Sequence, residues 1–159
     1  MTLDWKNLLD PKSTLVSFST GDEEALDDFA VAAPDDTAAT IRIVRGKRCT
    51  TREQLFQEWA AALQFPSYFG ENWDALEECL SDLEWLTAGG LVLFVTQADR
   101  LLEYSPDDLS TFGDVVKTAA KEWKKSHPAA PFHLVFHATL DAEAKARERL
   151  AAAGLMPHY

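Results

Sequence analysis

Residues 66–80 read PSYFGENWDALEECL, a loop followed by the start of a helix. Pro66 ends the helical pattern that precedes it, and Gly70 is the loop residue expected to need an unusual backbone angle. Asn72 is a good N-cap, because its side-chain oxygen can accept a hydrogen bond from a backbone N–H of the first turn. Apolar side chains then recur at helical spacing, which predicts that one face of this helix packs on a core. They are Trp73, Leu76, Leu80 and Leu83.

The other face of the predicted helix is acidic. Asp74 and Glu78 are i,i+4 neighbours of like charge, which costs an isolated helix about 0.2–0.5 kcal/mol. Asp74 is partly compensated by the helix dipole because it lies in the first turn, and Glu78 is not. Glu77 adjoins them, and the aromatic pair Tyr68 and Phe69 precedes the helix. Unpaired carboxylates beside loop aromatics fit a cationic protein surface, although core packing of Phe69 is favoured over its exposure.

The charge along the whole chain agrees with an acidic surface. The 159 residues include 26 Asp and Glu against 15 Lys and Arg, a net charge of −11. Nine of the carboxylates lie between Glu53 and Asp99, a segment without Lys or Arg. This argues against binding nucleic acid or an anionic membrane through a general basic surface, and leaves a cationic partner or simple solubility. A small basic cluster is expected to form ion pairs within the molecule: it comprises Arg42, Arg45, Lys47, Arg48 and Arg52.

Two cysteines are too few for a disulfide framework and lack the spacing of a metal site, which fits a reducing cytoplasm. Cys79 is expected to be a small buried residue and Cys49 a turn residue without a chemical role. No secretory signal and no apolar run of about 20 residues is visible. We therefore expect a single-domain cytoplasmic protein that is a monomer when free.

Strand and helix patterns alternate along the chain. Apolar or β-branched runs predict strands at residues 15–18, 41–44, 91–95 and 132–136, and helical patterns cover residues 23–29, 51–63, 73–83, 106–125 and 141–153. This alternation predicts an α/β fold with a parallel sheet and right-handed crossovers.

Patterns typical of catalysis are missing: the sequence contains no GxSxG, P-loop, GxGxxG or zinc-binding helix motif. His133 and His137 are predicted to share one strand face, where partly buried or edge histidines are favoured over a metal pair. Asp74 and Glu78 could in principle do glycosidase-type work, but one exposed helix does not give two carboxyls different pKa values. The protein is therefore expected not to be an enzyme and to need no metal or cofactor.

The quoted stretch closely resembles the signature of the barstar family, intracellular protein inhibitors of barnase-type ribonucleases. That signature has an aromatic pair, Gly-Glu-Asn, an aliphatic residue, Asp-Ala-Leu, two variable positions and a Cys-Leu pair. The flanking strand and helix patterns are similar as well, so the resemblance covers residues 40–137. It implies a barstar-like three-stranded parallel sheet packed with about four helices. Residues 1–39 would form an acidic N-terminal extension that can add an edge strand, and residues 138–159 a C-terminal helical extension packed on the same domain.

The resemblance also implies a function, which is to block the active site of a basic ribonuclease with the acidic helix and the aromatic loop. Carboxylates would take the places of RNA phosphates there. Carried over by position, the contact residues are Tyr68, Phe69, Gly70, Asn72, Asp74, Glu77 and Glu78. Glu77 and Glu78 stand where the family prototype has Trp followed by Asp, which favours a related ribonuclease over barnase itself. The alternative is a barstar-like binding module, or an orphan immunity protein, whose partner is not a ribonuclease.

Overall fold

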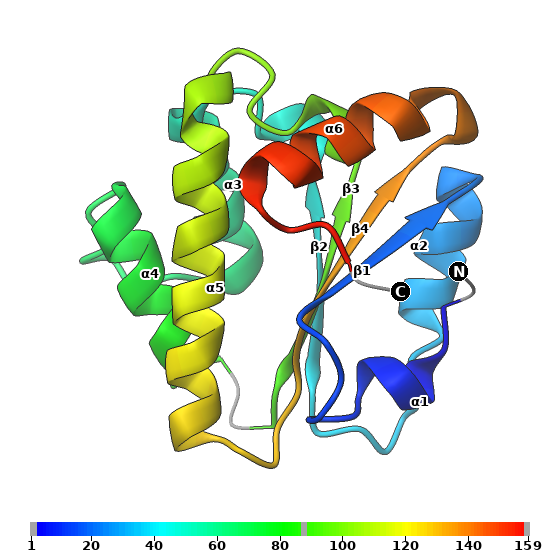
Figure 1. The fold of residues 1–159 in the computed structure, drawn as a ribbon. Coiled ribbons are helices and arrows are strands. Elements are labelled where there is room, and N and C mark those ends of the chain that lie inside the picture. The colour runs from blue at the N-terminus through cyan, green and yellow to red at the C-terminus, as the bar shows by residue number, and fades with distance from the viewer. Residues whose placement is uncertain (1–2, 87–88, 158–159) are drawn as a thin grey trace.

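The computed structural model describes residues 3–86 and 89–157, and its centre is a parallel sheet (Figure 1). Four strands pair in the order β1-β4-β3-β2. They are β1 (Val16–Thr20), β2 (Thr40–Arg45), β3 (Leu91–Thr96) and β4 (Phe132–Ala138). The predicted α/β class with a parallel sheet is confirmed. To the three strands of the resembled family the N-terminal segment adds β1 beside β4, the edge strand that this extension was expected to be able to add.

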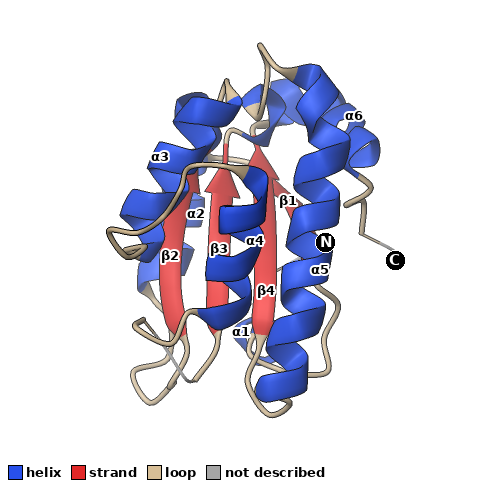
Figure 2. Ribbon diagram, turned by 90° about the vertical axis from the view of Figure 1, so that its left-hand side faces the viewer, coloured by secondary structure: helices blue, strands red, loops and turns tan. Residues whose placement is uncertain are grey.

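Helices cover both faces of the sheet (Figures 1 and 2). The described residues form six α-helices, whereas about four were expected in the family-like domain and one more in the C-terminal extension. On one face lie α1 (Trp5–Leu8) and α2 (Glu23–Val31); on the other lie α3 (Arg52–Leu63), α4 (Trp73–Asp82), α5 (Leu109–Ser126) and α6 (Glu143–Ala153). Short 3₁₀ turns complete the chain at η1 (Gly46–Arg48), η2 (Ala98–Arg100), η3 (Pro106–Asp108) and η4 (Leu140–Ala142). No described helix has both the length and the apolar composition to span a membrane.

The inner strands β3 and β4 are buried on both faces, which explains their uninterrupted apolar runs. Side chains alternate between the two faces along a strand. Leu91, Leu93 and Val95 therefore join the core beneath α3, α4, α5 and α6, whereas Val92 and Phe94 join a second core beneath α1 and α2. Two layers of helices are thus held by one sheet.

The second core depends on the N-terminal segment. The Trp5 ring stacks on Phe29, with ring centroids 4.9 Å apart, and meets the edge of Phe94 at 5.8 Å. Helix α1 has only four residues, with the Asp4 side chain accepting a hydrogen bond from Lys6 N. Sequence patterns did not predict it, because so short a helix shows no periodicity and is stabilised by packing.

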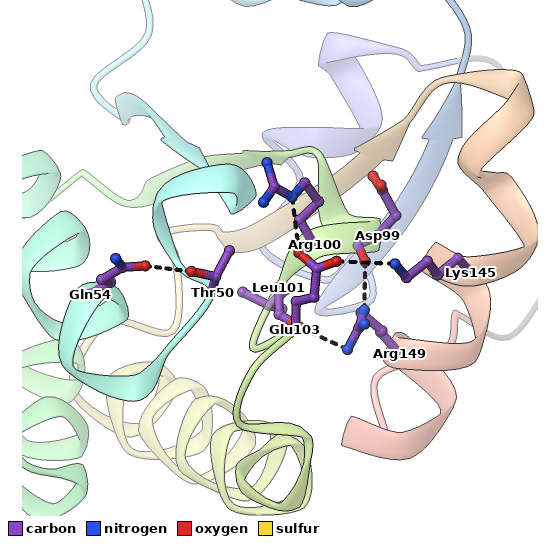
Figure 3. A network of polar contacts seen from close by, with 8 residues as sticks. All are labelled: Thr50, Gln54, Asp99, Arg100, Leu101, Glu103, Lys145 and Arg149. Carbon is purple, nitrogen blue, oxygen red and sulfur yellow. Dashed lines mark hydrogen bonds and ion pairs between the residues drawn. The ribbon is translucent and has the colours of Figure 1, made fainter.

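At the C-terminal end of the sheet, polar contacts attach α6 to the segment that follows β3 (Figure 3). Glu103 accepts hydrogen bonds from Arg100 Nε at 3.0 Å and from Lys145 Nζ at 3.3 Å. Arg149 of α6 donates to the backbone carbonyls of Asp99 and Leu101. The last helix is therefore fixed over the ends of the strands.

The two histidines of β4 are fully buried, because β1 pairs with β4 and makes it an inner strand. The prediction of partly buried or edge histidines was therefore wrong. Ser17 Oγ lies 2.7 Å from His133 Nε2 and Ser13 Oγ lies 3.3 Å from Nδ1. Burial lowers the pKa of His133 to about 4, so its imidazole is neutral at physiological pH. No group of three His, Cys, Asp or Glu within the described ranges could hold a metal.

Candidate protein-binding surface

The loop before α4 is ordered by hydrogen bonds of its own. Phe69 N donates to Pro66 O at 3.0 Å, and the Asn72 amide Nδ2 donates to Gly70 O at 3.2 Å. The left-handed backbone angle predicted for Gly70 occurs instead at Glu71, whose φ is 49°. Gly70 matters for a different reason: a Cβ there would lie 3.1 Å from Asn72 Nδ2, so a side chain would crowd the loop.

Helix α4 begins where the sequence predicts and is seated on the larger core. Asn72 Oδ1 accepts a hydrogen bond from Ala75 N at 2.8 Å, which confirms the N-cap. Leu76 and Leu80 are buried, and the half-buried Trp73 meets the edge of Phe56 with centroids 4.9 Å apart. Figure 2 shows α4 beside α5 in the outer layer, so its remaining face points away from the sheet.

The outward side of α4 and its two flanks carry carboxylates, which we call the α4 acidic surface. Asp74 and Glu78 are exposed and Glu77 is half-buried. The exposed Glu71, Asp82 and Glu84 extend the surface beyond the residues predicted from the sequence. Their signal was the absence of Lys and Arg between residues 53 and 99. None of these six carboxylates has an ion-pair partner in the part of the chain that the structure describes.

The aromatic pair of the loop divides into one exposed and one packed ring. Tyr68 is 71% exposed. Its pKa is raised by partial desolvation, and negative charge on neighbours that include Glu78 and Asp82 adds to the shift. Phe69 is half-buried and packs against Phe65 with centroids 4.9 Å apart, as its preferred core role implied. Tyr68 thus presents an aromatic surface beside the carboxylates while Phe69 anchors the loop.

The seven residues carried over from the family pattern lie in one continuous segment of loop and helix. Tyr68, Gly70, Asn72, Asp74 and Glu78 are exposed, whereas Phe69 and Glu77 are partly covered. The Asn72 side chain is already engaged in capping α4, so it also has a structural role.

The basic cluster pairs within the molecule only in part. Arg45 lies 4.0 Å from Asp27, and Arg52 lies 3.3 Å from Glu53 and 3.9 Å from Asp108. Arg42 donates instead to the carbonyls of Ala62 and Ile41, and Lys47 and Arg48 have no ion pair with any described residue. The described basic residues thus form no ion pair with the α4 acidic surface.

The two cysteines are free and buried. Burial raises the pKa of the Cys49 thiol far above its ordinary value, and it raises that of Cys79, on the buried side of α4, to about 11. Both are therefore thiols at neutral pH, and neither has the character of a nucleophile.

Comparison with known proteins gives one family. A family model described as Barstar (barnase inhibitor) matches residues 39–147, which include β2, α3, the loop, α4, β3, α5 and β4. Among solved structures, the chain is similar at 12% identity and a TM-score of 0.47 to a chain in "Structure of Drosophila ORC bound to AT-rich DNA and Cdc6". That similarity covers 88% of this chain and 46% of the other, and it is too weak to support a conclusion. A comparison with curated proteins gives no match.

Proposed function

Because the chain belongs to the barstar family, we propose that it inhibits a barnase-type ribonuclease by placing the α4 acidic surface in the enzyme's active site. Ribonucleases bind RNA phosphates with Arg and Lys, and carboxylates in matching positions form charge-assisted hydrogen bonds with the same groups. The observation that carries the proposal is the set of six carboxylates without ion-pair partners among the described residues. A basic active site would supply those partners.

The arrangement of α4 supports this proposal energetically. Glu78 has a like charge one turn before it, Asp74, and another one turn after it, Asp82. Each such pair destabilises a helix slightly, and a cationic partner would turn the repulsion into attraction. The rigid seating of α4 on the core limits the entropy lost on binding. The exposed Tyr68 ring beside the carboxylates has the character of an interface anchor.

We propose the contact set Tyr68, Phe69, Gly70, Asn72, Asp74, Glu77 and Glu78, with no catalytic role and no cofactor. The family consists of inhibitors, which supports a protein partner over a substrate. Free cysteines in the structure support action in a reducing cytoplasm.

For domain organisation we propose one barstar-like domain at residues 40–137, with residues 1–39 and 138–159 as extensions packed on it. Two contacts support the packing of both extensions on the domain. Strand β1 of the N-terminal extension pairs with β4, and Lys145 of the C-terminal extension reaches Glu103 of the domain.

A second candidate is a barstar-like module, or orphan immunity protein, that binds a cationic protein other than a ribonuclease. The α4 acidic surface favours it equally, because charge complementarity requires a basic partner but not a nuclease. Mixing the purified protein with a panel of barnase-type ribonucleases separates the two. We expect inhibition of RNA cleavage with a 1:1 complex. Complex formation with a basic protein in the absence of inhibition would favour the second candidate, and no inhibition at micromolar protein would refute the first.

Variants test the surface itself. Asp74→Ala and Glu78→Ala are each expected to weaken binding of an inhibited ribonuclease by at least about 2 kcal/mol, roughly 30-fold in Kd. Asp28→Ala is a matched control, because Asp28 is an exposed carboxylate on α2, on the opposite face of the sheet from α4. Unchanged affinity in both α4 variants would show that this surface is not used.

A further inference from the structure

A cavity lies on the face of the sheet opposite α4, between α2 and the ends of β1 and β4. Its volume is about 330 Å³, near the lower end of ligand-binding cavities. Ser19, Thr20, Asp22 and His137 give it a polar side, and Leu26 and Phe29 of α2 give it an apolar side. None of the residues proposed to contact a ribonuclease lines this cavity.

His137 is the unusual residue of this cavity. It lines the cavity and the residue is only 2% exposed, but its ring nitrogens are not among the fully buried atoms that lack a partner, and no hydrogen bond joins them to a described residue. Its register partner across the parallel pair is Ser19, on the same face of the sheet. The other buried histidine, His133, is bonded through both nitrogens. The His137 imidazole, unlike that of His133, is therefore not used by a hydrogen bond within the described residues and is available to a ligand in the cavity.

The charges around His137 indicate which ligand charge would suit the cavity. Burial lowers the pKa of His137, and the carboxylates of Glu23, Asp27 and Asp22 only oppose this shift. The imidazole is therefore neutral near pH 7 and can accept a hydrogen bond. Asp27 has a buried Oδ1 without a partner, and its one ion pair, with Arg45, is long at 4.0 Å. A hydrogen-bond donor carrying positive charge suits these surroundings.

The position in the fold is one where α/β proteins commonly bind ligands. After β1 the chain turns to α2 on one face, whereas after β4 it turns to η4 and α6 on the other (Figure 1). Loops that leave neighbouring strands in opposite directions open a crevice at the carboxyl ends of those strands. Gly21, with a φ of 132°, makes the sharp turn out of β1 at this crevice.

We propose that this cavity binds a small organic amine in its ammonium form. The ammonium group lies between Asp22 and His137, and the apolar part of the ligand packs on Phe29 and Leu26. Asp22 uses Oδ1 to cap Glu24 N at 3.1 Å, which leaves its other carboxylate oxygen for the ligand. Phe29 is held in place by its stack on Trp5, so the apolar wall is pre-formed.

The test uses the full chain and 2-phenylethylammonium chloride as the probe. We expect saturable shifts of the His137 ring resonances in NMR titrations, and no comparable shifts with the neutral 2-phenylethanol or the anionic phenylacetate. Asp22→Asn is expected to weaken probe binding at least tenfold, because a charge-assisted hydrogen bond is lost. Asparagine caps helices as well as aspartate does, so α2 remains intact in this variant. Asp28→Asn is the matched control, since Asp28 is exposed on α2 and does not line the cavity.

Three outcomes would overturn the proposal: no saturable shift at His137, equal binding of the alcohol or the carboxylate, or unchanged affinity in Asp22→Asn. Binding of the amine that is lost equally in Asp28→Asn would also refute it, because the effect would then reflect net charge alone. Competition with a bound ribonuclease is not expected, since the cavity and α4 lie on opposite faces of the sheet.

Discussion

Replacing Glu78 by glutamine is expected to stabilise the free protein while it weakens partner binding. Glu78 is exposed near the middle of α4, where it lacks an ion pair with any described residue and gains little from the helix dipole. Its neighbours one turn away on either side are Asp74 and Asp82. Glutamine has nearly the same helix propensity, so the change isolates the charge.

The magnitude follows from the two like-charge pairs. Each i,i+4 repulsion is worth about 0.2–0.5 kcal/mol, so removing both should raise the free energy of unfolding by about 0.4–1 kcal/mol. For a chain of this size that corresponds to an increase in Tm of about 1–4 °C. The same substitution removes a carboxylate from the proposed contact and is expected to raise the Kd for an inhibited ribonuclease roughly 30-fold.

Urea unfolding at low salt and again at about 1 M NaCl measures the gain in the free energy of unfolding that Glu78→Gln is expected to give. The gain should shrink at high salt, where the Debye length is about 3 Å. Glu122→Gln serves as the control, because it breaks an i,i+3 ion pair with Lys125 and should stabilise nothing. Equal or lower stability of Glu78→Gln at low salt, or a gain that persists at high salt, would refute the electrostatic reasoning.

Further predictions address other parts of the molecule. Asn72→Ala should lower the free energy of unfolding by about 1 kcal/mol in urea titrations through loss of the cap on Ala75 N, and Asn72→Asp should cost much less. His133 binds a proton more weakly when folded (pKa about 4) than when unfolded (about 6.5), so its contribution to stability is complete above pH 6.5 and is lost towards pH 4. The loss should reach about 3 kcal/mol, and the pH dependence of unfolding should be flatter in His133→Gln. Gly113→Ala should lower Tm sharply, since a Cβ there would overlap Ala153 O, whereas Ala119→Gly lacks this clash and should be milder. The rate constant for association with a ribonuclease should fall at least roughly tenfold from low to high salt, because salt screens the attraction between the two charged surfaces. An association rate constant that does not change with salt would contradict electrostatic steering.

Most elements of the fold could be predicted from local sequence. The cap at Asn72 occurs where the pattern indicates, and the structure shows further local caps of this kind at Thr51, on Gln54 N, and at the left-handed Gly154 after α6. Such signals work because they involve residues only a few positions apart. The pairing of β1 with β4 was not accessible in this way, since Val16 lies beside Leu134. That pairing decided the number of strands and the burial of both histidines of β4.

The proposed ribonuclease contact was predictable as a segment but not as a surface. The family motif identified Tyr68, Asp74 and Glu78, and all three are exposed in the structure. The contact set carried over from the motif did not include Glu71, Asp82 or Glu84, because a motif records residue types and not which side chains share a face. The cavity at His137 gave no sequence signal, since its lining comes from α2 and from two strands that are distant in sequence.

The sequence by itself determined helices α2 to α6, the inner strands, the acidic composition of residues 53–99 and membership of the barstar family. These properties depend on capping, periodicity and residue type, which act over a few positions. The tertiary structure alone decided which carboxylates lack partners and which ring nitrogens are bonded. The reason is physical: contacts such as that between Ser17 and His133 join residues 116 positions apart, and only the closure of the sheet brings them together.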